Sequence, residues 1–111
     1  MIMEEQKNNL ETKKAQANVV KRILDYIILT LLRDKSKHGY ELMDEIKKSF
    51  QVTIGASSMY PMLAKLEENE LVTGTWNIIN DHPRKIYSLT AKGEETLTYI
   101  RDFLTQLVKV C

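Results

Sequence analysis

Hydroxyl, aromatic and cationic side chains are the residues of this sequence whose types and spacing could do chemistry. Ser57 and Ser58 stand at the start of a segment with helical spacing, and Tyr60, Pro61 and Lys65 follow within it. Serine hydroxyls, the free amides at a helix start and lysine ammonium groups all bind phosphate oxygens. The pattern therefore predicts contact with a phosphate-bearing polymer rather than bond-making chemistry.

A second set of polar residues lies in two shorter segments. Lys37 and His38 stand just before a segment of helical spacing, and Arg84 and Lys85 follow a turn-forming sequence. Lysine and arginine neutralise backbone phosphates, and arginine is favoured where the minor groove is narrow. We predict that both sets contact DNA, with solvated surface lysines and an ordinary serine cap as the alternatives.

The net charge and the rare residue types exclude other chemistries. The formal net charge is +1, so any basic surface must be local. The single cysteine, Cys111, can form no intrachain disulfide, and its distance in sequence from His38 and His82 gives no metal-ligand spacing. The sequence also has no glycine-rich phosphate loop and no nucleophile–base pair. We expect no enzyme activity, no metal and no cofactor.

The elements that must position these residues follow from the hydrophobic pattern. Only four glycines and two prolines occur, which favours helices. The period is helical in four segments and alternating in two. In chain order the predicted elements are helices over 19–32, 39–49 and 58–69, strands over 71–77 and 85–89 with a turn at 80–83, and a helix over 91–110.

Local signals predict how these elements begin and which way they face. Ser58 is predicted to be the N-cap of the third helix, which places Pro61 where its missing amide costs nothing. Thr90 is predicted to cap the last helix. Tyr40 is predicted to face the core, and Tyr87 likewise from the alternation of its strand.

Three helices followed by a hairpin predict a winged helix-turn-helix, mainly α with a β-hairpin wing (α+β). At 111 residues the chain fits one such domain, over 19–90, with a C-terminal dimerisation helix over 91–111. Residues 1–18 form a polar N-terminal arm that is frayed, or helical only against something else. We expect the helix over 58–69 to enter the major groove and the wing over 78–87 to lie on the flanking backbone or minor groove.

Three sequence blocks resemble the signature motifs of the PadR family of transcriptional regulators. They are His38–Leu42 (HGYEL), Ser58–Glu67 (SMYPMLAKLE) and Pro83–Gly93 (PRKIYSLTAKG). The blocks occur in the order and spacing of that family, whose short members end in one dimerisation helix. The resemblance implies a prokaryotic regulator of repressor type that binds DNA as a dimer.

The chain departs from the family pattern at three positions. Ser57 and Glu70 stand where glycine is common, and Ala64 stands where many members carry a basic residue. With the near-neutral net charge, Ala64 keeps open an alternative class, a winged-helix module that binds proteins and no specific DNA. The salt dependence of DNA binding separates the two classes.

The last predicted helix carries an apolar seam suited to pairing two copies of the chain. Its members step by three and four residues: Leu97, Ile100, Leu104, Leu107 and Cys111. We predict a homodimer through this seam and Ile23, with packing onto the chain's own first helix as the alternative. Two-fold symmetry then predicts recognition helices roughly 34 Å apart and a pseudo-palindromic operator in double-stranded DNA.

Two further expectations concern a small-molecule effector and the cellular location. Some PadR-family members bind planar aromatic compounds between their subunits, and Trp76, Tyr99 and Phe103 could line such a space here, with ordinary packing as the alternative. The longest apolar segment, 23–32, contains Asp25 and is far shorter than the roughly 20 residues of a membrane span. The polar N-terminus lacks the apolar stretch of a signal peptide. We expect a cytoplasmic protein.

Overall fold

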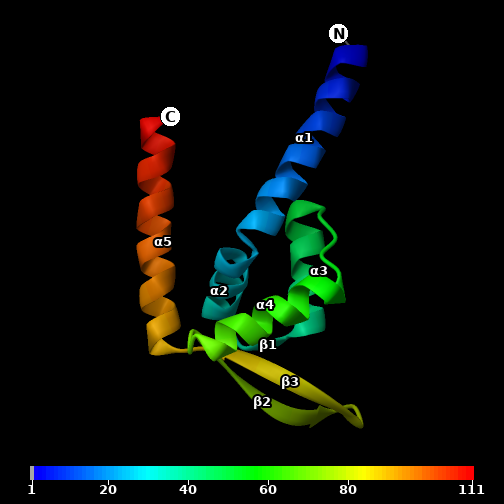
Figure 1. Cartoon of the computed structure of the whole chain (residues 1–111). Helices are drawn as coiled ribbons and strands as arrows, with labels where there is room; N and C mark the ends of the chain where they lie inside the picture. The colour runs from blue at the N-terminus through cyan, green and yellow to red at the C-terminus, as the bar shows by residue number, and fades with distance from the viewer. Residues whose placement is uncertain (1) are drawn as a thin grey trace.

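The computed structural model of the chain contains helices and one three-stranded antiparallel sheet (Figure 1). It describes the backbone of residues 2–111 and the side chains of residues 9–111, so Met1 of the predicted arm lies outside the described residues. The elements are α1 (Ile2–Arg22), α2 (Leu24–Asp34), β1 (Lys37–His38), α3 (Gly39–Phe50), α4 (Ala56–Glu68), β2 (Val72–Ile79), β3 (His82–Leu89) and α5 (Ala91–Val110). The mainly α fold with a β-hairpin wing is confirmed.

The helix α2 lies at the centre of the domain, as its nearly continuous apolar pattern predicts. Its buried residues are Leu24, Ile27, Ile28, Leu29 and Leu32. The elements α1, α4, β3 and α5 all contact it. Burying each large aliphatic side chain contributes about 1.5–3 kcal/mol, so this helix contributes much of the hydrophobic stabilisation of the core. Within the described residues, no helix is both long and apolar enough to cross a bilayer.

The single helix predicted over residues 19–32 is wrong, because the chain bends at Ile23 and forms two helices. Ile23 has φ −111° and ψ 28°. Hydrogen bonds continue through the bend, from Ile23 N–H to Val19 O (3.0 Å) and from Ile27 N–H to Ile23 O (3.0 Å). The apolar spacing of the sequence also runs through Ile23, so it does not reveal where the first helix ends. The described part of the predicted arm is helical and belongs to α1, whose N-terminal half projects from the body (Figure 1).

The helices α3 and α4 form the helix-turn-helix. A capping box starts α3: His38 Nδ1 accepts a hydrogen bond from Glu41 N–H (3.3 Å), and the Glu41 carboxylate accepts one from His38 N–H (3.1 Å). Leu42 and Ile46 then face the core. The capping box thus fixes the direction in which α3 leaves β1.

The helix α4 begins earlier than predicted. Its N-cap is Gly55 rather than Ser58, and Pro61 therefore lies inside the helix. Proline has no amide to donate to the carbonyl of Ser57. Both Ser57 and Pro61 are exposed, so water can supply the missing donor. The prediction failed because it placed proline only where no amide is needed.

The strands β2 and β3 form the wing. Its turn consists of Asn80 and Asp81 alone, with φ values of 51° and 65°, so the predicted turn residues His82 and Pro83 belong to β3. A two-residue turn with two positive φ angles matches the twist of a hairpin, and asparagine and aspartate tolerate that conformation. The short strand β1 pairs with β3, which leaves β2 as an outer strand.

Thr90 is the N-cap of α5, as predicted, and it ties this helix to the turn before the wing. Its hydroxyl accepts a hydrogen bond from Gly93 N–H (2.9 Å) and lies 2.7 Å from the Glu70 carbonyl oxygen, to which it donates. A β-carbon on Gly93 would overlap the carbonyl oxygen of Leu71. The Thr90–Gly93 spacing therefore fixes where α5 leaves the body.

The turn after α4 holds Glu70 at φ 63°, the left-handed conformation. Two hydrogen bonds define this helix end, from Glu70 N–H to Glu67 O (3.0 Å) and from Leu71 N–H to Leu66 O (2.9 Å). Glycine is usual in this arrangement because other residues are strained by about 1 kcal/mol or more. Glu70→Gly is therefore expected to raise the free energy of unfolding by about 1 kcal/mol, and the melting temperature by several degrees.

Thermal and urea unfolding measure this effect. Glu70→Ala is the matched control, because it removes the same charge and keeps the strain. If both variants were stabilised equally, the charge of Glu70 rather than its backbone would be the cause.

Candidate nucleic-acid interface

The outward side of α4 carries the polar residues predicted to contact DNA. Ser57, Ser58, Pro61 and Lys65 are exposed, and Tyr60 is 39% exposed. The buried residues of the helix are Met59, Leu63 and Leu66. The helical spacing thus predicted both sides correctly. The hydroxyls and free amides of the first turn lie at one end of the exposed side, where they can meet a phosphate.

Tyr60 packs across the start of α3. A β-carbon on Gly39 would lie 2.7 Å from both the ring and the hydroxyl of Tyr60, so only glycine allows this approach. The ring thereby lies against the start of α3, beside the exposed side of α4. This contact gives the glycine of the first sequence block a physical reason, and it could not be found from the helical period because it joins two helices.

Arg84 of the wing lies over the ring of Tyr40, with its guanidinium carbon 5.1 Å from the ring centre. Within residues 9–111 no carboxylate forms an ion pair with Arg84. The stacked guanidinium keeps its N–H groups available for a phosphate. Tyr40 is 59% exposed, so the prediction that it faces the core is wrong; Leu42 fills that place.

Glu67, near the end of α4, joins this helix to the wing. Its Oε1 accepts a hydrogen bond from Lys85 Nζ (2.8 Å), and its Oε2 accepts one from Gly74 N–H (3.2 Å). The hydrogen bond between the two side chains holds the pKa of Glu67 below and that of Lys85 above their usual values. We call Glu67, Gly74 and Lys85 the wing clamp. Lys85, predicted to contact DNA, has its ammonium group engaged with the protein.

The charge of Glu67 should make the stability of the protein depend on acid. Because the native pKa of Glu67 is lowered, its contribution is present above the usual carboxyl value of about 4.3 and is lost as the pH falls through the lower native value. Glu67→Gln is expected to lower the free energy of unfolding by about 1 kcal/mol at pH 7 and by much less at pH 3. Urea unfolding at both pH values measures the difference.

Glu68→Gln is the control for this titration, since Glu68 is the exposed neighbour and takes no part in the wing clamp. It should have the same small effect at both pH values. An equal loss for Glu67→Gln at pH 7 and pH 3 would mean that its charge contributes nothing.

Lys37 is not available to DNA, contrary to the prediction. Its side chain is 1% exposed, and its Nζ donates to the carbonyl oxygen of Leu31 (2.6 Å). The carboxylates of Asp34 and Glu45 lie 3.8 and 3.9 Å from the same nitrogen. Pairing of β1 with β3 turns Lys37 toward the interior, which a two-residue strand does not reveal in sequence. The neighbouring His38 is half-buried and occupied as the N-cap of α3.

The three aromatic residues predicted to line an effector space do not come together in the chain. Trp76 is 67% exposed on the wing, where it lines a depression of about 390 Å³ with Tyr60. Tyr99 and Phe103 are exposed on α5. The sequence predicted a shared surface from residue type alone. In the structure Trp76 lies in β2 of the wing, whereas Tyr99 and Phe103 lie on α5.

The apolar seam predicted on α5 divides into a buried and an exposed part. Leu97 is fully buried in the chain's own core, so it is not available to a partner and the seam prediction is wrong there. Ile100 and Leu104 are half-buried on the helix that contacts α2. Leu107 and Cys111 are exposed. Ile23, at the bend before α2, is half-buried.

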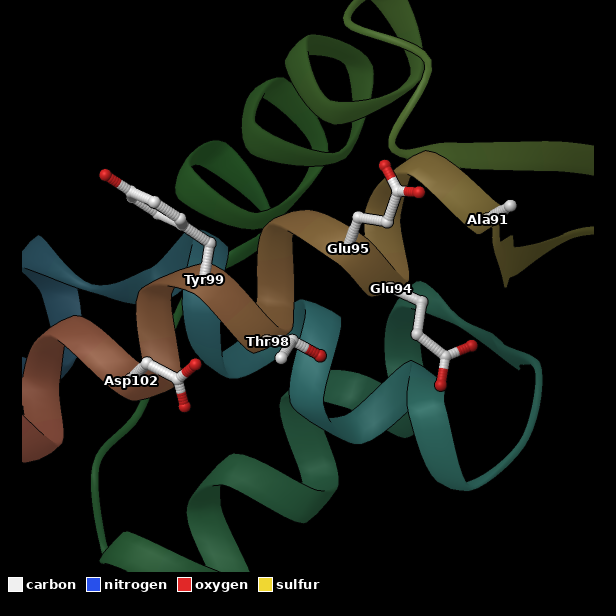
Figure 2. Close-up of a pocket in the computed structure, with 6 residues that line it drawn as sticks. All are labelled: Ala91, Glu94, Glu95, Thr98, Tyr99 and Asp102. Carbon is white, nitrogen blue, oxygen red and sulfur yellow. The ribbon is translucent and has the colours of Figure 1, made fainter.

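A second apolar series on α5 shares Leu107 with the predicted seam, and as a series it was missed from the sequence. We call it the α5 stripe, and its members step by three and four residues: Tyr99, Phe103, Leu107 and Val110. Figure 2 shows the side chains near the start of this stripe, where Tyr99 and Asp102 extend from α5 beside a surface hollow of about 570 Å³. Following the 3–4 spacing from Tyr99 as well as from Leu97 would have found it.

A helix-turn-helix with an exposed polar helix, a β-hairpin wing and a long last helix defines the winged helix-turn-helix class of regulators. Residues 28–99 match the PadR-like transcriptional regulator family. The chain belongs to this family. It is therefore a transcriptional regulator and not an enzyme.

Several known proteins are similar to this chain. A transcriptional regulator of Mycobacterium tuberculosis is 29% identical over 83 residues, which cover 74% of this chain and 76% of the relative. An uncharacterized protein of Lysinibacillus sphaericus is 29% identical over 99 residues, covering 85% and 83%. The crystal structure of a PadR-like transcriptional regulator from Bacillus cereus has a TM-score of 0.75 at 26% identity and covers 84% of this chain and 91% of that one.

Proposed function

We propose that the chain binds double-stranded DNA as a homodimer and represses transcription from a pseudo-palindromic operator. The outward side of α4 carries the proposal, because its serines, Tyr60 and Lys65 are exposed. The buried residues of the helix are Met59, Leu63 and Leu66. A major groove about 12 Å wide admits such a helix. The repressor role rests on the resemblance to PadR-family regulators.

The contacts follow from the positions of the exposed groups. Ser57 and Ser58 offer their hydroxyls to one phosphate and Ser57 also its amide, since the Ser58 N–H donates to the Gly55 carbonyl (3.1 Å); Tyr60 and Lys65 follow along the groove. Arg84, stacked on Tyr40, meets the flanking backbone or the minor groove. Lys37 and Lys85 are not among the proposed DNA contacts, because Lys37 is buried and Lys85 belongs to the wing clamp.

The exposed apolar surface of α5 supports the dimer. Large aromatic and aliphatic side chains of the α5 stripe, such as Phe103 and Leu107, are exposed in the single chain, which is typical of an interaction surface. A two-fold dimer that contacts successive major grooves needs its two copies of α4 roughly 34 Å apart. A regulator of this kind acts in the cytoplasm, and an effector held between the subunits would meet Tyr99 and Phe103 rather than Trp76.

Selection of bound genomic fragments, followed by a salt titration on the best fragment, tests the proposal. With 6–10 phosphate contacts, the affinity should fall by about 10³–10⁵ between 50 and 200 mM salt. Arg84→Ala should weaken binding to most sequences and reduce the salt slope by about 0.9.

Lys109→Ala, in the last turn of α5, is the control and should leave the salt slope unchanged. A wild-type chain that selects no fragment and shows no salt dependence would contradict the proposal. That result would favour the alternative class, a winged-helix module that binds proteins.

A further inference from the structure

The outer strand of the wing has an amide that its own sheet does not use. The sheet order is β1-β3-β2, so one edge of β2 has no partner strand. Gly74 lies in β2 opposite Tyr87 of β3, and its N–H points to Glu67 Oε2 instead (3.2 Å). A carboxylate from α4 thus takes the place that a neighbouring strand would take.

The ammonium group of Lys85 is paired within the protein, although its side chain stays 28% exposed. Its Nζ lies 2.8 Å from Glu67 Oε1 and 5.6 Å from the ring centre of Tyr87. A β-carbon on Gly74 would overlap the Lys85 stem and lie 3.1 Å from Glu67 Oε2. Glycine at this place therefore lets the lysine cross β2 to reach the carboxylate.

A second contact holds the wing from another helix. Arg84, the neighbour of Lys85 in β3, stacks on Tyr40 of α3. The two contacts therefore join the wing to both helices of the helix-turn-helix, to α3 through Arg84 and to α4 through Lys85. Of the two cations, Arg84 keeps free N–H groups, while the ammonium group of Lys85 is paired with a carboxylate.

We propose that Glu67 is a positioning residue for DNA binding, which sets the wing relative to the recognition helix α4 through Lys85 and Gly74. In this role Lys85 contacts no phosphate. The inference rests on the proposed function and deepens it, because the distance between α4 and the wing decides whether both reach the same duplex. The lowered pKa of Glu67 agrees with a carboxylate that stays charged in the clamp.

The slope of the salt dependence distinguishes a positioning residue from a phosphate contact. Each phosphate contact contributes about 0.9 to the slope of log K against log salt. Lys85→Met is expected to lower the affinity for the selected fragment about tenfold with an unchanged slope, since only the ordering of the wing is lost. Lys85→Arg keeps the pair with Glu67 and should restore most of the affinity. Arg84→Ala calibrates the assay by reducing the slope.

Glu67→Ala tests the same inference from the other partner. It is expected to lower the affinity about tenfold and to speed hydrogen exchange at the Gly74 amide. Glu68→Ala removes a neighbouring negative charge without touching the clamp and controls for the general effect of charge. Melting temperatures confirm that each variant is folded at the assay temperature.

Three results would overturn the inference. One is a slope reduced by about 0.9 in Lys85→Met, which would make Lys85 a phosphate contact. Another is an affinity raised by Glu67→Ala beyond the change seen with Glu68→Ala, which would make Glu67 a competitor of DNA. The third is an affinity unchanged in both clamp variants. The proposed function fails separately, if the wild-type chain shows no salt-dependent binding.

Discussion

Replacing Lys37 with alanine is expected to lower the free energy of unfolding by about 3 kcal/mol, measured by urea unfolding. The ammonium group donates to the Leu31 carbonyl and lies near Glu45, whose Oε2 is buried and accepts no hydrogen bond. Alanine removes the hydrogen-bond donor of the Leu31 carbonyl and the positive charge beside the Glu45 carboxylate. The melting temperature should fall by more than 10 °C, as for other domains of this size.

Lys35→Ala is the matched control, because Lys35 is the exposed lysine two residues earlier and should change the stability by less than about 0.5 kcal/mol. Lys37→Met retains the buried stem and loses only the charge, so it divides the effect between packing and electrostatics. If Lys37→Ala were no less stable than Lys35→Ala, the buried position of Lys37 would be wrong.

Leu97→Ala is expected to cost about 3 kcal/mol of folding stability, since Leu97 is fully buried in the core of the single chain. Unfolding measured at several protein concentrations separates this loss from a change in dimerisation. The unfolding midpoint should fall at every concentration. The dissociation constant of the proposed dimer, measured by sedimentation of the folded variant, should equal that of the wild type.

Leu107→Ala provides the comparison from the same helix, because Leu107 is 49% exposed on the α5 stripe. It should change the stability of the dilute chain by less than about 0.5 kcal/mol and weaken the proposed dimer. A reversed pattern, with Leu97→Ala affecting dissociation and Leu107→Ala affecting the fold, would restore the seam first predicted from the sequence.

The order of the elements could be predicted because their hydrophobic periods are long and distinct. The apolar pattern of residues 19–32 predicts helical structure there, and the buried residues of α4 recur every three or four positions. The start of α5 follows from Thr90, whose side chain caps the helix wherever the chain can turn. These features depend on neighbours in sequence.

The features that could not be predicted depend on segments distant in sequence. Pairing with β3 makes a strand of two residues that propensity would leave in a turn, and this pairing buries Lys37. The chain bends at Ile23 within an unbroken apolar pattern, and the Tyr26 N–H there donates to the Asp25 side chain. The N-cap at Gly55 is set by where α4 meets the core rather than by the serines that follow.

The candidate site follows the same division. The exposed side of α4 could be predicted from its helical period. The residues that hold it in place, Gly39 under Tyr60 and Glu67 across to Lys85, are separated from their partners by 18 positions or more. One-dimensional spacing gives no sign of such approaches, although the alternation of β3 correctly placed Tyr87 in the core.

The open edge of β2 has a consequence for handling the protein in concentrated solution. Trp76 and Ile78 are exposed on this outer strand, and hydrophobic residues on an unpaired edge favour strand pairing between molecules. Glu67 occupies only the amide of Gly74, farther from the hairpin tip. Purified samples should therefore aggregate through the wing. Ile78→Lys is expected to reduce this aggregation, because a charged residue on an edge strand opposes pairing between molecules.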